Sequence, residues 1–500
     1  MDSPVPVRPA GNGPEGETGT TVRYQKTGGF LKPEGALIPP PKDAVQHRMG
    51  VEVHKGQNNT LIVAASVAGL AIGGASTIGI SENAFAAGLS AGWYDTAWAI
   101  GAVIAGLFVV DRLRRGNYDT ISDLIGDLYG SRTRILMVIT MCLIQSGIIA
   151  LQYKAGGSIL AALLPKVFTV QSGTFFSFVI FVLVAAIGGM GSVTLTNVLN
   201  IILIYVGVIS ATLIVLLQRG GLQAVRAMEA AEPQMHYLSP TAGMGWIGIA
   251  SWIIVLIGTT SSVQGVVQIG LTGKDDRASK RGYLLGALLM IPIGFICALL
   301  GVAAKALMPG ADAATALPQI LMDMPPLLAG ITLSGLWAAD MGTGCSMVVG
   351  LSTTIRADIL DRTETGKRLT KEKKGVNTVI IVLSGIITYI VATQMGTILG
   401  ALQKALSLSI GIAFMVLFGL LAPGFASKKA GFITTIVAII GLVLWNLLPS
   451  LAGVFPSVAF FMLALCAVTF LGLSVLLPDK VKQSAAAGKK VSAGTAAGLE

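Results

Sequence analysis

The chain has 500 residues, of which 53% are hydrophobic and 12% are charged, and its mean hydropathy is +0.76. The charged fraction is about half that of a soluble domain, so the composition excludes an ordinary soluble enzyme, a disordered protein and a coiled coil. The net charge of +10 has to be located relative to a membrane before any other partner is considered, and we expect contact with lipid rather than nucleic acid.

Apolar segments long enough to cross a bilayer recur along the whole chain. A spanning helix needs roughly 20 apolar residues, and the sequence predicts an all-α polytopic protein with twelve such helices. The predicted spans are 60–88, 93–110, 134–163, 173–191, 194–217, 244–270, 282–308, 329–354, 376–394, 398–421, 430–448 and 453–477.

Basic residues gather in every second loop of this arrangement. They lie between spans two and three, six and seven, eight and nine, and ten and eleven, whereas the loop at 218–243 carries only Arg219 and Arg226. The positive-inside rule therefore places both termini in the cytoplasm, and the even number of spans agrees. We expect a multi-pass protein of the cell (plasma or inner) membrane. Polar residues 1–56 and 478–500 are predicted to be cytoplasmic tails, the first of them disordered.

Two of the predicted spans are poorly suited to continuous helices. Span one contains residues 73–79 and span six contains residues 258–265, and both stretches are rich in Gly, Ser and Thr. Glycine costs about 1 kcal/mol inside a helix, and a break at membrane depth is tolerated where it lines a cavity. Broken helices five spans apart indicate two inverted repeats of a transporter. The alternative is that these small residues only permit close helix packing.

Several short motifs, in order, resemble the sodium:solute symporter family, whose members have a LeuT-type core. No single motif is specific, but their order and spacing over eight helices are. The matching stretches are Gly74-Ala75-Ser76-Thr77-Ile78-Gly79, Thr120 to Leu124, Tyr129 to Arg132, Gly188-Gly189 with Thr196-Asn197, Gln264 with Gln268, Leu317-Pro318 to Thr343, and Arg356-Ala357-Asp358.

The resemblance implies a domain organisation and an activity. The first repeat is expected at 57–217 and the second at 244–422, with an extracytoplasmic loop at 218–243 between them and accessory helices at 423–477. The protein would move a small organic solute together with sodium, which serves as the coupling ion in the absence of any cofactor. Its oligomeric state is left open.

The family's main sodium site maps onto the two facing helices. The resemblance places the carbonyls of Ala75, Ile78 and Ala339 and the hydroxyl of Thr343 around the ion, and sodium favours such oxygen ligands. The fifth position falls on Gly342, which has no side chain to offer. Either water or the neighbouring Asp340 would substitute. The alternative for Thr343 is a hydroxyl bonded back to its own helix.

Two ionisable residues lie inside predicted spans, where such residues are costly and often functional. Asp340 could bind sodium, carry a proton or pair with Lys154. An unpaired Lys154 could hold a solute carboxylate, which favours an amino acid or a monocarboxylate as the solute. Glu82 and Asp95 are expected to be solvated carboxylates at the rim of the site.

Polar residues at the two breaks are the expected contacts of the solute. They are Thr77, Thr260, Ser261 and Gln264. For Gln264, a hydrogen bond between helices is the alternative.

Two rival interpretations remain beside sodium symport. A proton-coupled transporter of the same fold would use Asp340, and a transporter-like membrane sensor would signal through its tail. The sequence shows no nucleophile–base pair, metal cluster or cofactor motif, so we do not expect an enzyme.

Overall fold

A computed structural model describes residues 24–27, 30–33, 58–116, 118, 120–188, 193–372 and 375–481. Within the predicted N-terminal tail, β1 (Tyr24–Thr27) and β2 (Phe30–Pro33) pair in antiparallel register, with Tyr24 opposite Pro33. The rest of that segment up to residue 57 lies outside the described residues, as do residues 482–500.

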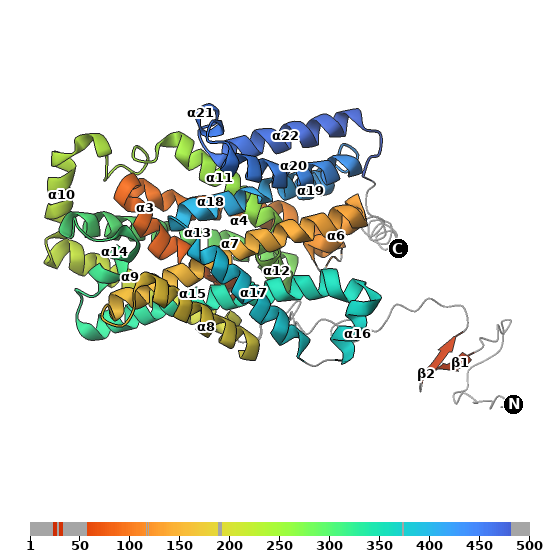
Figure 1. Cartoon of the computed structure of the whole chain (residues 1–500), viewed down its shortest axis with the longest axis horizontal. Helices are drawn as coiled ribbons and strands as arrows, with labels where there is room; N and C mark the ends of the chain where they lie inside the picture. Colours follow the sequence, from red (N-terminus) through yellow and green to blue (C-terminus); the bar gives the residue numbers. More distant parts are fainter. Residues whose placement is uncertain are drawn as a thin grey trace, which may run out of the picture. The chain divides into compact units, whose positions relative to one another are not determined.

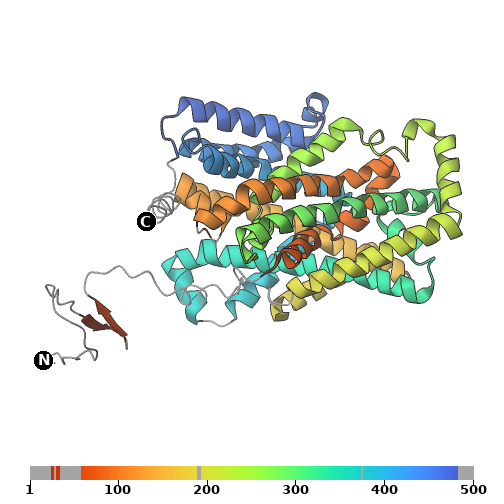
Figure 2. The same ribbon diagram turned by 180° about the vertical axis from the view of Figure 1, so that it is seen from behind.

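The second unit of the chain is helical (Figures 1 and 2). Its helices up to residue 231 are α2 (Thr60–Ala71), η1 (Ala75–Gly79), α3 (Ile80–Ala87), η2 (Gly88–Gly92), α4 (Trp93–Ile104), η3 (Ala105–Val110), α5 (Asp111–Gly116), α6 (Ile121–Tyr129), α7 (Ser131–Leu163), α8 (Val170–Gly188), α9 (Val193–Leu213), η4 (Ile214–Gln218) and α10 (Gly221–Ala231).

The helices after residue 231 complete the unit. They are η5 (Pro233–Met235), α11 (Gly245–Ser262), α12 (Gln264–Thr272), α13 (Asp276–Leu307), α14 (Ala313–Leu321), α15 (Pro326–Thr354), η6 (Ile355–Ile359), η7 (Leu360–Arg362), α16 (Glu364–Glu372), α17 (Val376–Thr393), α18 (Ile398–Ser407), α19 (Ser409–Leu421), α20 (Lys428–Leu447), α21 (Leu451–Val454) and α22 (Val458–Leu476).

Each of the twelve predicted spans coincides with one of these helices or with consecutive helices. Within the described part of the chain, nine helical segments are long and apolar enough to cross a membrane, or ten if α18 and α19, bent by 43°, form one span. The second predicted span and the later part of the first fall in one helical run, Ala75–Gly116, and the earlier part of the first is the separate helix α2. The 29-residue α15 is long enough, but its many Gly, Ser and Thr residues make it less apolar than the nine.

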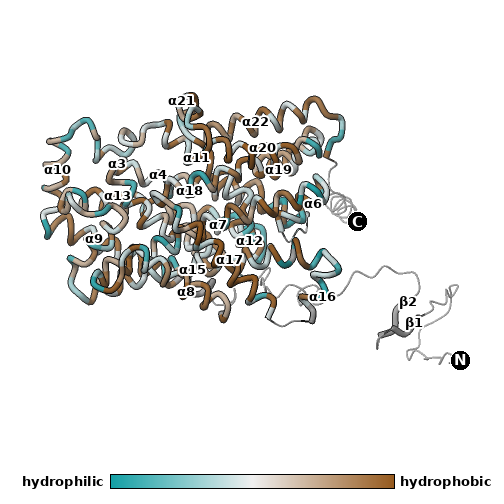
Figure 3. Tube along the Cα trace, in the orientation of Figure 1, coloured by the Kyte–Doolittle hydropathy of each residue, from teal (hydrophilic) through white to brown (hydrophobic). Residues whose placement is uncertain are grey.

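Apolar residues follow the lengths of the long helices, and polar residues gather in the turns, such as those around α16 (Figure 3). α6 and α16 lie at one end of the helical unit and α10 lies at the other (Figures 1 and 2). In the centre, α13 packs against α2, α3 and α4, and α7 packs against α8 and α15. The residues at the two breaks, 75–79 and 259–263, are all buried.

Close contacts between these helices depend on small residues, as is usual for helices in membranes. Gly101 of α4 faces α11 so closely that a Cβ atom there would lie 2.6 Å from Thr260 Oγ1 and 2.7 Å from the Leu256 carbonyl oxygen. The abundance of glycine in the sequence thus reflects packing as well as the two breaks.

Candidate functional site

The first helix is interrupted where the sequence predicts it. α2 ends at Ala71, Ile72 has a non-helical backbone (φ −80°, ψ 84°), and the chain continues as the π-helical turn η1. The freed backbone N–H of Gly74 donates to Gln152 Oε1 of α7 at 2.9 Å. A side chain of a neighbouring helix therefore satisfies a backbone group that lipid could not.

Glycine at this break allows the three helices to meet. A Cβ atom on Gly74 would lie 2.8 Å from Gln152 Oε1 and 3.1 Å from Asp340 Oδ1, and one on Gly73 would lie 3.1 Å from Thr343 Oγ1. The break thus faces α7 on one side and one face of α15 on the other. The sequence analysis did not select Gln152 as a candidate, although a polar amide inside an apolar span indicates a functional residue.

The second break is narrower than predicted. α11 continues through Ser262, and only Val263 (φ −77°, ψ 125°) separates it from α12. The hydroxyls of Thr259, Thr260 and Ser262 donate to carbonyls one turn back in α11. Small hydroxyl residues are thus compatible with this helix because they bond to its own backbone.

Among the candidate sodium ligands, Thr343 is the one that would bind the ion through its side chain. Its hydroxyl is buried and has no hydrogen-bond partner, so it is not bonded back to α15. Ala75 and Ile78, in the turn that follows the break, and Ala339 of α15 are also buried. The carbonyl of Gly342 accepts the Ser346 hydroxyl at 2.6 Å, and residue 342 supplies no further oxygen.

Asp340 and Lys154, whose pairing is one of the alternatives from the sequence, do not contact each other. Asp340 is fully buried, and neither carboxyl oxygen has a hydrogen-bond partner. The Lys154 ammonium instead donates to the carbonyl oxygens of Met395, at 3.3 Å, and Gly396. Of the three alternatives for Asp340, the pair with Lys154 is therefore absent from this conformation, because Lys154 reaches the turn between α17 and α18 rather than α15.

The four remaining solute candidates differ in their surroundings. Thr77 is buried and donates to the Gly73 carbonyl at 3.1 Å, and the buried Ser261 hydroxyl has no hydrogen-bond partner. Thr260 packs against Gly101 of α4. Gln264 accepts the backbone N–H of Ile121 at 2.8 Å, so its side chain bridges to α6, as the alternative reading of this residue expected.

The two acidic residues predicted at a solvated rim differ in the structure. Glu82 is half-buried and accepts the backbone N–H of Ile398 at 2.8 Å. Asp95 is fully buried and lies 2.6 Å from the Ser76 hydroxyl. The rim prediction is therefore wrong for Asp95, because the start of α4 is covered by α13 rather than by solvent.

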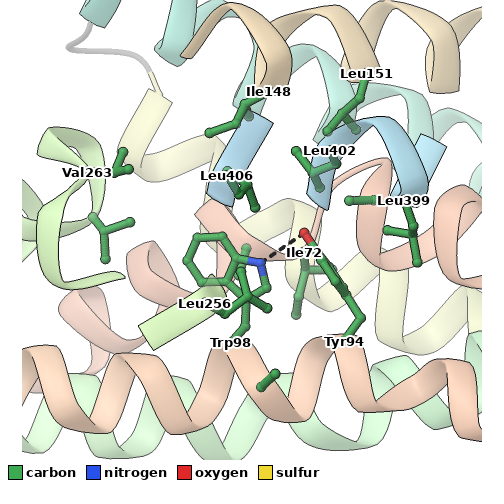
Figure 4. Close-up of a cluster of buried hydrophobic side chains, with 14 of the residues drawn as sticks. Ile72, Tyr94, Trp98, Ile148, Leu151, Leu256, Val263, Leu399, Leu402 and Leu406 are labelled. Carbon is green, nitrogen blue, oxygen red and sulfur yellow. Dashed lines mark hydrogen bonds between the residues drawn. The ribbon is translucent and has the colours of Figure 1, made fainter. Parts of the chain in front are cut away.

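A small cavity lies beside the first break. Tyr94 and Trp98 of α4 face it, and their side chains are joined by a hydrogen bond of 2.9 Å (Figure 4). Its remaining lining is mostly aliphatic, with the Gln152 amide and the Thr343 hydroxyl as polar groups. The full lining is Leu70, Ala71, Ala75, Tyr94, Trp98, Ile148, Leu151, Gln152, Val263, Val266, Thr343, Met347, Leu402 and Leu406.

Ion pairs close the end of the bundle that carries α6. Arg134 at the start of α7 lies 2.7 Å from Asp358 of η6 and 3.3 Å from Asp123 of α6. Asp358 also accepts the Ser122 hydroxyl at 2.9 Å. Because Arg134 and Asp358 are mostly buried, this cluster holds α6, α7 and η6 together.

Solved structures support the fold. A substrate-bound, outward-open Na⁺-coupled sialic acid symporter matches with a TM-score of 0.69 at 15% identity, over 88% of this chain and 95% of that chain. Mhp1, a nucleobase-cation-symport-1 family transporter in a closed conformation with bromovinylhydantoin bound, matches with a TM-score of 0.54 at 15% identity, over 88% of this chain and 97% of that chain. At such low identity these similarities show the LeuT-type fold alone.

No curated protein matches the sequence significantly. The family model of the sodium:solute symporter family, in contrast, matches residues 56–448. That match covers both broken helices, the cavity and the buried Thr343 and Asp340. The chain is thus a multi-pass membrane protein that belongs to the sodium:solute symporter family.

Proposed function

We propose that the protein takes up a small organic solute together with sodium by alternating access. The observation that carries the proposal is the buried, unpartnered hydroxyl of Thr343 opposite Gly73 of the first break. A hydroxyl left without a partner at such depth is costly unless a ligand satisfies it. Backbone carbonyl oxygens at the break, each of which has a second lone pair, can complete the oxygen shell that sodium requires.

In this proposal the ion lies between the first break and α15. The carbonyls of Ala75, Ile78 and Ala339 and the Thr343 hydroxyl would bind it, with water or Asp340 in place of a side chain at Gly342. The two repeats, 57–217 and 244–422, would rock around this site. We place the protein in the plasma or inner membrane with both termini in the cytoplasm, because the positive-inside rule assigns the basic loops to the cytoplasmic side.

The solute would lie next to the ion, and we propose that it bears a carboxylate, as an amino acid or a monocarboxylate does. Lys154 supports this choice because, in the described part of the chain, only neutral carbonyls accept its hydrogen bonds and no carboxylate forms an ion pair with it. Its ammonium could therefore exchange Gly396 for a solute carboxylate as a point charge. Thr77, Thr260, Ser261 and Gln264 would approach the solute when the helices move.

Thermal unfolding of the purified protein in NaCl and in choline chloride tests the sodium site. A ligand that binds the folded state raises the melting temperature by mass action. We expect a sodium-specific rise that one carboxylate solute increases and that Thr343→Ala removes. A melting temperature that is equal in the two salts would contradict the proposal.

A proton-coupled transporter is the second candidate, and the unpartnered Asp340 favours it. Uptake into proteoliposomes under a sodium gradient alone, or under a proton gradient alone, separates the two. Uptake driven only by the proton gradient and abolished in Asp340→Asn would support the second candidate.

A further inference from the structure

Asp95 is a buried acid that the proposed sodium and solute sites do not use. It lies at the start of α4 with 0% of its surface exposed, and its Oδ1 is 2.6 Å from the hydroxyl of Ser76 in η1. Its other oxygen, Oδ2, has no hydrogen-bond partner. Among the residues that the structure describes, no Lys, Arg or His forms an ion pair with it.

The hydrogen bonds of Ser76 indicate the protonation state of this acid. The Ser76 hydroxyl oxygen lies 2.8 Å from the Ala71 carbonyl oxygen as well as 2.6 Å from Asp95. A hydroxyl has one proton to donate, and a carbonyl oxygen can only accept. Both contacts are hydrogen bonds only if Ser76 donates to Ala71 and a protonated Asp95 donates to Ser76.

The surroundings of Asp95 agree with a neutral acid. α13 covers it closely, since a Cβ atom on Gly294 would lie 3.1 Å from Asp95 Oδ2. The titratable groups that interact electrostatically with Asp95 are Tyr94 of α4, Tyr205 of α9 and Cys297 of α13. All three are ordinarily uncharged at neutral pH, so none of them can neutralise a carboxylate here.

We propose that Asp95 is a proton-binding site that fastens η1, the first turn after the break, to α4. When Asp95 loses its proton to water, Ser76 has to donate to the carboxylate and gives up Ala71. A carboxylate at this depth also needs water or a cation, because a buried charge without either is strongly disfavoured. Loss of the proton therefore loosens η1 from α4, so the conformation of the broken helix depends on pH.

This inference rests on the proposed transport function only for its consequence, which is pH-dependent movement of the first helix. Its test uses no solute. Amide hydrogen exchange of the full-length purified protein is followed over residues 75–87 in choline chloride, in acidic and in alkaline buffer. Wild type and variants are compared at the same pH, so the intrinsic pH dependence of exchange cancels.

Asp95→Asn is the informative variant, since its amide can donate to Ser76 at every pH. We expect protection of residues 75–87 in wild type to fall below that of Asp95→Asn by about three- to tenfold in alkaline buffer, which is the worth of one hydrogen bond. The two should be equal in acidic buffer. Glu82→Gln, which changes a half-buried acid on α3, should keep the wild-type pH dependence.

Ser76→Ala is the second variant and decides the question if Asp95→Asn does not fold. It removes the partner of Asp95, so the amide protection of residues 75–87 should be low. The pH dependence beyond that of intrinsic exchange should vanish. Wild-type pH dependence in Asp95→Asn or in Ser76→Ala would overturn the proposal. A pH dependence that NaCl abolishes in wild type would also overturn it, because Asp95 would then hold sodium rather than a proton. The sodium-dependent melting shift lost in Thr343→Ala remains a separate measurement, so the two proposals can fail independently.

Discussion

Glu82 of α3 accepts the backbone N–H of Ile398, the first residue of α18, at 2.8 Å. The same end of α18 is approached from α7, where Lys154 donates to the carbonyls of Met395 and Gly396. Further along α18, Leu402 and Leu406 line the cavity (Figure 4). Two charged side chains therefore hold the helix that covers the candidate site.

Glu82→Leu should free the start of α18, because the backbone N–H of Ile398 loses its acceptor. In a variant without native cysteines that carries Leu402→Cys, a water-soluble thiol reagent should then react faster, by about three- to tenfold for one lost hydrogen bond. Glu82→Gln retains an acceptor oxygen and serves as the control. Equal labelling rates in the leucine and glutamine variants would show that this bond does not hold α18.

Arg134→Ala should open the end of the bundle that carries α6. It removes the nearer of the two arginines that pair with Asp358, at 2.7 Å against 3.6 Å for Arg362. The Asp358 side chain is only 9% exposed, and hydrogen bonds to charged groups contribute about 1.5–3 kcal/mol each. We expect a lower melting temperature and faster thiol labelling of Met347→Cys in the same cysteine-free background.

The control for that experiment is Lys367→Ala, which breaks an exposed ion pair with Glu364. Pairs of this kind contribute about 0–1 kcal/mol, so neither the melting temperature nor the labelling should change appreciably. A similar loss of stability in both variants would contradict a specific role for Arg134.

The two breaks could be predicted from the sequence because their cause is local. Gly73 and Gly74 weaken a helix wherever it lies. The hydroxyl residues before Val263 signalled the second break, but they remain helical, so that break is narrower than predicted. The burial of Asp95 and the engagement of Lys154 by Gly396 could not be predicted in this way. Both depend on which helix lies opposite, and therefore on packing angles that a single sequence does not reveal.

Gln264 is a further residue whose contact could not be predicted from the sequence alone. Its position beside a break was evident, but a helical side chain next to a break can point to several neighbours. In the structure it accepts the N–H of Ile121 at the start of α6. The alternative for Gln264, a hydrogen bond between helices, thus describes its contact in this conformation. That Gln264 binds the solute stays a prediction.

Gly74→Ala should disrupt the site without any change in polarity. The added methyl group would lie 2.8 Å from Gln152 Oε1 and would meet the Cβ atom of Ala155, so α7 would have to move away from the break. Overpacking of this kind costs about 1–3 kcal/mol. We expect a lower melting temperature and loss of the sodium-dependent shift.

Gly350→Ala in α15 is the matched control, because no atom outside the adjoining backbone of α15 lies within 4 Å of the added methyl group. Replacing an unconstrained helical glycine is expected to stabilise the protein by about 0.5–1 kcal/mol. If Gly350→Ala also removed the sodium-dependent shift, close contact at Gly74 would not be the cause.

Asp479, which follows the last helix, should make stability depend on pH. It accepts the Ser427 hydroxyl at 2.6 Å and the backbone N–H of Lys429 at 3.0 Å, at the start of α20. Burial opposes its charged form, but these hydrogen bonds outweigh burial and hold the pKa of Asp479 below its ordinary value. Its contribution is therefore complete above the ordinary pKa of about 3.9 and is lost as the pH falls through the lower pKa of the folded protein.

Because this carboxylate is near the surface, the contribution should be no more than about 1 kcal/mol. Asp479→Asn keeps an acceptor but removes the charge, so its melting temperature should be below that of wild type at neutral pH. The difference should disappear in acid, where both side chains are neutral. A difference that persists unchanged at low pH would mean that the side chain acts through its shape rather than its charge.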